Sequence, residues 1–229
     1  MLLALVVVSG LLYALPAVAS AGVWDISPTN ATFTATAGTT KLTASGLTVT
    51  CTANSTAGAY ETATTGKITK LVFTGCTGPL GVKCTGTLNV GEPEGTITAT
   101  TPVTFHNIRL EASPSTQIGI QITPKAIDNT FTEGLGHFAT FKCAGIQTTV
   151  AGNGIIGEVT KPTCGGAAST TGTLVFESTS TGVQKWQQIT TSGTKYHLWS
   201  KTGGGSHLES SEDGTGNIEF GSSVTATCT

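Results

Sequence analysis

The stretch Ile118-Gly119-Ile120-Gln121-Ile122-Thr123 alternates between isoleucine and small or polar residues. Successive side chains of a β-strand point to opposite faces, so this period of two places three isoleucines on one packed face. The same signature, β-branched and aromatic residues bounded by Gly, Pro, Asn or Ser, returns at 32–36, 47–52, 70–74, 95–100, 137–143, 174–176, 196–199 and 224–227. No segment favours an amphipathic helix over this pattern.

Short strands that follow one another at intervals of about 8–12 residues are typical of an all-β sandwich or barrel. The alternation indicates one packed face and one wet face in each strand, which is the pattern of antiparallel sheets. We therefore expect an all-β fold, an antiparallel β-sandwich or barrel-like domain. We expect residues 22–229 to form this single domain, with a possible subdomain boundary near 112–116. A chain of this size buries a core of its own, so disulfides would reinforce the fold.

The first 21 residues differ from the rest of the chain. Residues 2–12 are almost entirely apolar, and Pro16 is followed by a run of small residues. An apolar run before an A-x-A site, here Ala17-Val18-Ala19 or Ala19-Ser20-Ala21, is typical of a cleaved signal peptide. We expect a secreted or cell-wall-associated protein with no membrane attachment after cleavage of residues 1–21. An uncleaved membrane anchor is the alternative.

The composition is poor in charge. Asp, Glu, Lys and Arg make up 10% of the residues and the net charge is −2, whereas a charged share of about 25% is usual. The eleven basic residues include a single arginine, Arg109. Nucleic-acid binding depends on clustered lysine and arginine, so the composition argues against a nucleic-acid partner.

Six cysteines, an even number, follow the apolar N-terminus: Cys51, Cys76, Cys84, Cys143, Cys164 and Cys228. In an exported chain this predicts disulfide bonds, and six cysteines allow 15 pairings. Loop closure favours neighbours, which suggests Cys51–Cys76 and Cys143–Cys164 and leaves Cys84 for Cys228. No C-x-x-C pair and no nearby histidine has the spacing of a zinc site. We expect no metal ion and no cofactor.

Three aromatic residues, Trp186, Tyr196 and Trp199, gather in the last third of the sequence. Aromatic rings on an exposed β face stack on sugars, so these residues are the candidates for a ligand-binding site. Packing in the core is the more frequent role of such residues and is the competing interpretation.

The densest group of oxygen ligands, the kind that calcium prefers, consists of Glu209, Glu212, Asp213, Asn217 and Glu219. Their spacing matches no established calcium loop. The Gly-rich stretch 201–213 is typical of an exposed, solvated loop, and we favour that interpretation. No G-x-S-x-G motif is present and no spacing selects a pair of carboxylates, so we expect no catalytic residues.

Several segments carry a resemblance to other proteins. Leu47-Thr48-Val49-Thr50-Cys51-Thr52, Val72-Phe73-Thr74-Gly75-Cys76-Thr77-Gly78, Phe138-Ala139-Thr140-Phe141-Lys142-Cys143 and Thr173-Leu174-Val175-Phe176 resemble segments of uncharacterised secreted β-rich proteins of high-GC actinobacteria. The resemblance covers most of residues 22–229 as a loose pattern. It implies export and a β fold, and no activity comes with it.

These observations favour a secreted cell-envelope or extracellular-matrix domain that acts by binding or adhesion, without catalysis. Its expected partner is cell-wall or extracellular polysaccharide, or a second copy of the chain. Two alternatives stay open. A secreted polysaccharide hydrolase would need a cleft with two carboxylates, and a small-ligand-binding β-barrel would need a deep apolar cavity.

Overall fold

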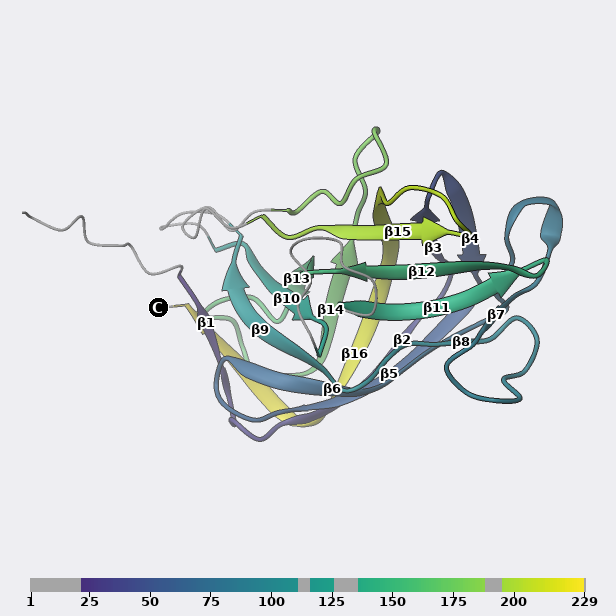
Figure 1. The fold of residues 1–229 in the computed structure, drawn as a ribbon. Coiled ribbons are helices and arrows are strands. Elements are labelled where there is room, and N and C mark those ends of the chain that lie inside the picture. The colour runs from purple at the N-terminus through teal and green to yellow at the C-terminus, as the bar shows by residue number, and fades with distance from the viewer. Residues whose placement is uncertain (1–21, 111–115, 126–135, 188–194, 229) are drawn as a thin grey trace, which may run out of the picture.

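The computed structural model describes residues 22–110, 116–125, 136–187 and 195–228 (Figure 1). The expected signal peptide, 1–21, and most of the expected boundary at 112–116 lie outside these residues. The predicted all-β fold is confirmed, and of the two predicted forms the structure has the barrel. Every ladder between its strands is antiparallel.

Eight strands form a closed barrel, in which each strand pairs with the next barrel strand along the chain and the last, β16, pairs with the first, β2, to close the ring. The barrel strands are β2 (Thr32–Ala37), β5 (Ala53–Tyr60), β6 (Thr65–Thr74), β9 (Val103–Arg109), β10 (Ile118–Thr123), β13 (Ile155–Lys161), β14 (Ser169–Phe176) and β16 (Leu208–Cys228). An eight-stranded barrel has an interior just wide enough for side chains or for one small ligand.

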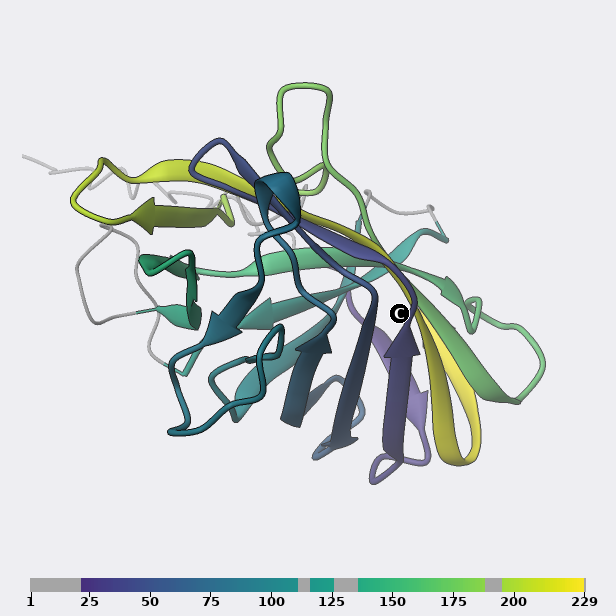
Figure 2. The same ribbon diagram turned by 90° about the vertical axis from the view of Figure 1, so that its right-hand side faces the viewer.

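The remaining strands lie mostly at one end of this barrel. In an up-and-down barrel every second connection leaves from the same end, and four such connections here carry extra strands. We call these the cap strands: β3 (Thr40–Ala44), β4 (Leu47–Cys51), β7 (Cys84–Gly86), β11 (His137–Cys143), β12 (Ile146–Gly152) and β15 (Leu198–Thr202). In Figure 1, β3, β4 and β7 lie opposite the end that holds β1 (Trp24–Ser27) and the C-terminus, and Figure 2 views the molecule from the cap side.

The cap strands pair in the order β4-β3-β16-β15-β12-β11-β7, so β16 belongs to both the barrel and the cap. Thr77 completes the cap as a second ring, because it bridges Thr50 of β4 on one side and Lys83, next to β7, on the other. The main-chain groups of Thr50 and Thr77 exchange two hydrogen bonds of 2.8 Å. We call this stretch between β4 and β7 the cap seam. The connection between β6 and β9, which carries Thr77 and β7, also contains a 3₁₀ turn, η1 (Pro79–Gly81), and the two-residue strand β8 (Ile97–Thr98).

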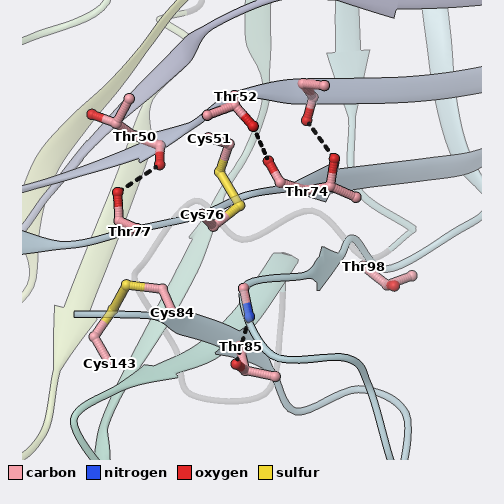
Figure 3. The surroundings of a disulfide bond; sticks show 12 residues. Thr50, Cys51, Thr52, Thr74, Cys76, Thr77, Cys84, Thr85, Thr98 and Cys143 are labelled. Carbon is pink, nitrogen blue, oxygen red and sulfur yellow. Dashed lines mark hydrogen bonds between the residues drawn. A yellow bond between two sulfur atoms is a disulfide. The ribbon is translucent and has the colours of Figure 1, made fainter. Parts of the chain in front are cut away.

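Three disulfides connect Cys51 to Cys76, Cys84 to Cys143 and Cys164 to Cys228. The first pairing confirms the sequence prediction, and the predicted pairs Cys143–Cys164 and Cys84–Cys228 are wrong. Loop length did not decide these pairs, because Cys84 and Cys143 are direct partners in the β7–β11 ladder. The first two bonds flank the cap seam (Figure 3), and the third ties the far end of β16 to the connection between β13 and β14.

The acidic stretch 201–213 corrects a second prediction. It was expected to be an exposed loop, but residues 208–213 begin strand β16 and a short turn, 203–207, connects them to β15. Both neighbouring strands supply ladders to this stretch, β15 to residues 208–210 and β3 to residues 211–213. Sequence composition assigns this charged segment to a loop. Pairing with β15 and β3 keeps it extended as a strand.

Candidate functional site

A cavity of about 160 Å³ lies between the interior of the barrel and the cap strands. Its lining is almost entirely apolar and comes from both parts: Ala35, Ile122, Ile155 and Leu174 from the barrel, and Val49, Phe141, Val150 and Leu198 from the cap. The cavity therefore depends on both rings, and neither ring encloses it alone.

Aromatic packing closes the barrel at the end away from the cap. The rings of Phe33, Tyr60 and Phe105 meet edge to face with centroids 4.8–6.3 Å apart. The indole nitrogen of Trp24, which is also buried, donates a 2.9 Å hydrogen bond to the carbonyl oxygen of Gly119. The Tyr60 hydroxyl donates to Asn107 Oδ1 at 3.2 Å, and burial raises the pKa of this phenol. These aromatic residues also line the cavity, so the free space extends from the cap down to this end of the barrel.

Small residues at inward positions create that space. On β16 the residues that line the cavity are at even positions, and Gly214 and Gly216 are the small ones. Their neighbour β2 contributes Ala35 and Ala37, and Ala37 is the direct partner of Gly216. A Cβ atom built on Gly216 has no heavy atom nearer than 3.8 Å. Two adjacent strands thus present almost no side-chain volume to the cap end of the barrel. The interior stays partly unfilled there, which gives rise to the cavity.

One carboxylate reaches this apolar lining. Glu212 lies on β16 at an inward position, opposite Leu42 of β3. Of the described residues that line the cavity, Glu212 alone is acidic, and Lys41 and Lys161 are the basic ones. A glycosidase needs two carboxylates across its cleft, so this lining does not supply the pair that the hydrolase alternative requires.

The residues around Glu212 fix its backbone and leave its carboxyl group to the cavity. Gln184, itself 2% exposed, accepts a 3.0 Å hydrogen bond from the Glu212 N–H and donates a 3.3 Å bond to the Glu212 carbonyl oxygen. The next residue, Asp213, points the other way, and its carboxylate accepts bonds of 2.6 and 2.7 Å from the N–H and hydroxyl of Ser178. The strand thereby separates the two neighbouring carboxylates. The Asp213 carboxylate is hydrogen-bonded on the outside, and the Glu212 carboxylate lies on the inside.

Burial raises the pKa of Glu212 from its ordinary value of 4.5 to about 7, and the negative charge of Asp213 adds to the rise. Removal from water disfavours the charged form of a carboxyl group, and a like charge nearby does the same. Within the described parts of the chain, no hydrogen bond or ion pair to the Glu212 carboxyl group counters these effects. The group is therefore poised to change its charge near neutral pH.

The three aromatic candidates do not share one exposed surface. Trp199 is 2% exposed and its ring meets the ring of His207 edge to face, 4.4 Å between centroids. Trp186 and Tyr196 are partly buried and pack against a small separate cluster of Ile108, Leu110 and Ile156. Core packing thus accounts for the position of each. A role for them in binding polysaccharide, like self-association, stays a prediction.

The acidic residues considered as calcium ligands, and not favoured as such, are also separated. Glu209, Glu212, Asp213, Asn217 and Glu219 all lie on β16, but Glu212 faces the cavity whereas Glu209 contacts His197, 2.9 Å from Glu209 Oε1 to His197 Nδ1. The described residues contain no group of three or more His, Cys, Asp or Glu side chains arranged for a metal ion. Among the same residues, no helix is long and apolar enough to cross a membrane.

No protein-family model, curated protein or solved structure matches the chain. The geometry of the barrel and its cavity is therefore the basis for the proposals that follow.

Proposed function

We propose that the protein binds a small, predominantly apolar molecule inside the barrel. The observation that supports this most strongly is the cavity of about 160 Å³ with an almost wholly apolar lining. Ligand sites are typically concave and apolar with a few polar groups that orient the ligand, and Glu212 is such a polar group. Among the functions considered from sequence, the small-ligand barrel is the one that requires this feature.

The size of the cavity sets the scale of the ligand. Protein interiors are close-packed, and a void of this size forfeits contacts along its whole lining. In another protein an apolar cavity of about 150 Å³ takes up benzene. The barrel therefore has room for at least a six-membered ring or a short alkyl chain, and binding would restore the lost contacts.

The proposal places this binding outside the cell. Residues 1–21 have the pattern of a signal peptide, and the three disulfides fit an oxidising compartment. A carrier or scavenger of apolar molecules gains from a closed barrel there, because the ligand is shielded from water.

The test is titration of the oxidised protein with hexan-1-ol, followed by backbone amide shifts in NMR spectra. We expect saturable shifts that map to residues lining the cavity, with the largest on β2, β3 and β16. In Gly216→Val the added side chain has open space in front of it and fills part of the cavity, so the affinity for hexan-1-ol should drop by about tenfold or more.

The matched control is Gly204→Val, which makes the same change at an exposed turn position with no atom within 4 Å of the new Cβ. This variant should bind hexan-1-ol like the unmodified protein. Shifts that never saturate, or equal binding by both variants, would contradict a ligand site in the barrel.

A further inference from the structure

The carboxyl group of Glu212 has an unusual environment for a charged side chain. It belongs to the lining of an apolar cavity, and its two neighbours on the inward face of β16 and β3 are Gly214 and Leu42. Glu212 is half-buried, and a carboxylate that is partly removed from water without a partner is disfavoured. A carboxyl group in such a place is a candidate for a functional residue.

The charged groups around Glu212 do not neutralise it. Asp213 on the same strand faces outward and bonds to Ser178. Lys41 of β3, the direct partner of Asp213, is exposed and also borders the cavity, but among the described residues no ion pair joins it to Glu212. On the hairpin that carries Gln184, the nearest ionic groups, Glu177 and Lys185, pair with each other. Lys161, which also borders the cavity, donates a 2.9 Å hydrogen bond to Thr171.

Resting on the proposed ligand-binding function, we propose that Glu212 is the anchor for a protonated amine, and that the ligand is a hydrophobic amine. The apolar lining would hold the hydrocarbon part of such a molecule, and the ammonium group would donate a hydrogen bond to the Glu212 carboxylate. Charge-assisted bonds of this kind are stronger than neutral ones. The bound ammonium group would give Glu212 an ion-pair partner, which no lysine of the described residues provides.

Two other head groups fit this site less well. A carboxylate on the ligand would meet the like charge of Glu212, and Asp213 would add to the repulsion. A neutral alcohol would find the apolar lining but would form a weaker bond with the carboxyl group. The site therefore ranks ligands of equal chain length in the order amine, alcohol, carboxylate.

The ranking depends on pH in a defined direction. A bound ammonium group favours the ionised carboxylate, whereas the free protein holds Glu212 largely protonated below its pKa of about 7. Amine binding must then release a proton, so the affinity should fall by up to about tenfold for each pH unit below that value. An alkyl amine keeps its own proton throughout this range, as lysine does.

The experiment compares hexylamine, hexan-1-ol and hexanoic acid by calorimetric titration at about pH 8 and about pH 5.5. We expect hexylamine to bind about tenfold or more tightly than hexan-1-ol at the higher pH and to lose most of this advantage at the lower pH. Glu212→Gln should abolish the preference for the amine and should change the affinity for hexan-1-ol much less, because a glutamine amide still forms a hydrogen bond with a hydroxyl group.

The control for net charge is Glu219→Gln, a change on the same strand at an exposed position outside the cavity lining. This variant should keep the preference for hexylamine. If hexan-1-ol binds but hexylamine binds no more tightly, or if Glu212→Gln keeps the preference, the anchor role of Glu212 is wrong while the barrel site stands. If none of the three molecules binds, both proposals fail.

Discussion

Glu212 is a residue whose protonation the fold controls. Its pKa in the folded protein is about 7 instead of 4.5, so the folded state holds a proton that the unfolded chain releases as the pH rises between these values. Stability falls with pH wherever the folded state binds more protons. The folded protein therefore carries the full cost of this carboxylate above pH 7 and none of it below the ordinary pKa.

We predict that Glu212→Gln stabilises the protein above about pH 7 by on the order of 2–3 kcal/mol and has little effect near pH 4.5. Chemical unfolding of both proteins across this range measures the difference. Burial lowers the pKa of His106, so that residue costs stability as the pH falls below its ordinary value. His106 is the same in both proteins, and the difference between them isolates Glu212. A difference that does not change with pH would contradict the prediction.

Two inward glycines predict opposite effects of the same substitution. A Cβ on Gly66 would lie 2.3 Å from both the Ala59 carbonyl oxygen and the Phe105 ring, whereas a Cβ on Gly216 meets nothing within 3.7 Å. We expect Gly66→Ala to cost about 1–3 kcal/mol through overpacking. Gly216→Ala should be neutral or stabilising by up to about 1 kcal/mol, because alanine loses less chain entropy on folding than glycine. Urea unfolding of the two variants tests this, and equal losses would be inconsistent with it.

At the scale of elements, the cap seam is the weakest part of the cap ring. The other neighbours in this ring share ladders of three or more residue pairs, whereas the seam depends on isolated bridges at Thr77. The disulfides Cys51–Cys76 and Cys84–Cys143 lie on either side of it. Covalent bonds thus secure the cap where main-chain pairing is sparse.

We predict that the double variant Cys84→Ser/Cys143→Ser loses about 2–4 kcal/mol of stability and releases bound ligand faster, because the cap loosens beside the cavity. The double variant Cys164→Ser/Cys228→Ser removes the disulfide at the other end of the barrel. That disulfide closes a loop of similar length, 64 residues against 59 for Cys84–Cys143. This variant should lose comparable stability and keep the release rate. Thermal unfolding and NMR exchange measurements separate the two effects, and equal release rates would rule out the cap as the ligand's exit.

Elements with clear alternation could be predicted from sequence. The bounds 118–123 and 137–143 agree with β10 and β11, since both alternate and end at turn residues. Strand β5, with the sequence ANSTAGAY, has no large apolar residue before its last position and so gives no periodic signal. Its place in the barrel comes from pairing with β2 and β6 on either side, which no local pattern reveals.

The cavity lies beyond what local patterns can predict for a related reason. Gly216, Ala37 and Leu174 are neighbours across three strands that are distant in sequence. Once the closed order of the strands is known, the small residues at inward positions of β2 and β16 signal an unfilled interior. The sequence singles out Glu212 together with the other acidic residues of 209–219. That Glu212 and Asp213 face opposite sides follows only once both are known to lie in a strand.

At the scale of the whole molecule, the proposed ligand stabilises every element that its cavity joins. Both rings line the cavity, so unfolding either one releases the ligand. Hexan-1-ol at about 100 times its Kd should raise the free energy of unfolding by about 2.7 kcal/mol. Differential scanning calorimetry should show one transition that moves to higher temperature. A transition that splits, with one part unaffected, would show that the cap and barrel unfold separately.

The course of synthesis follows from the position of β16. This one strand of 21 residues pairs with β14 and β2 in the barrel, with β15 and β3 in the cap, and with β1. Residues 208–228 follow all the other strands of both rings along the chain, so they are synthesised after them, and until they are made neither ring can close. The growing chain therefore stays without its final fold until β16 has been made, and an unfolded chain is the form in which a polypeptide can be threaded across a membrane.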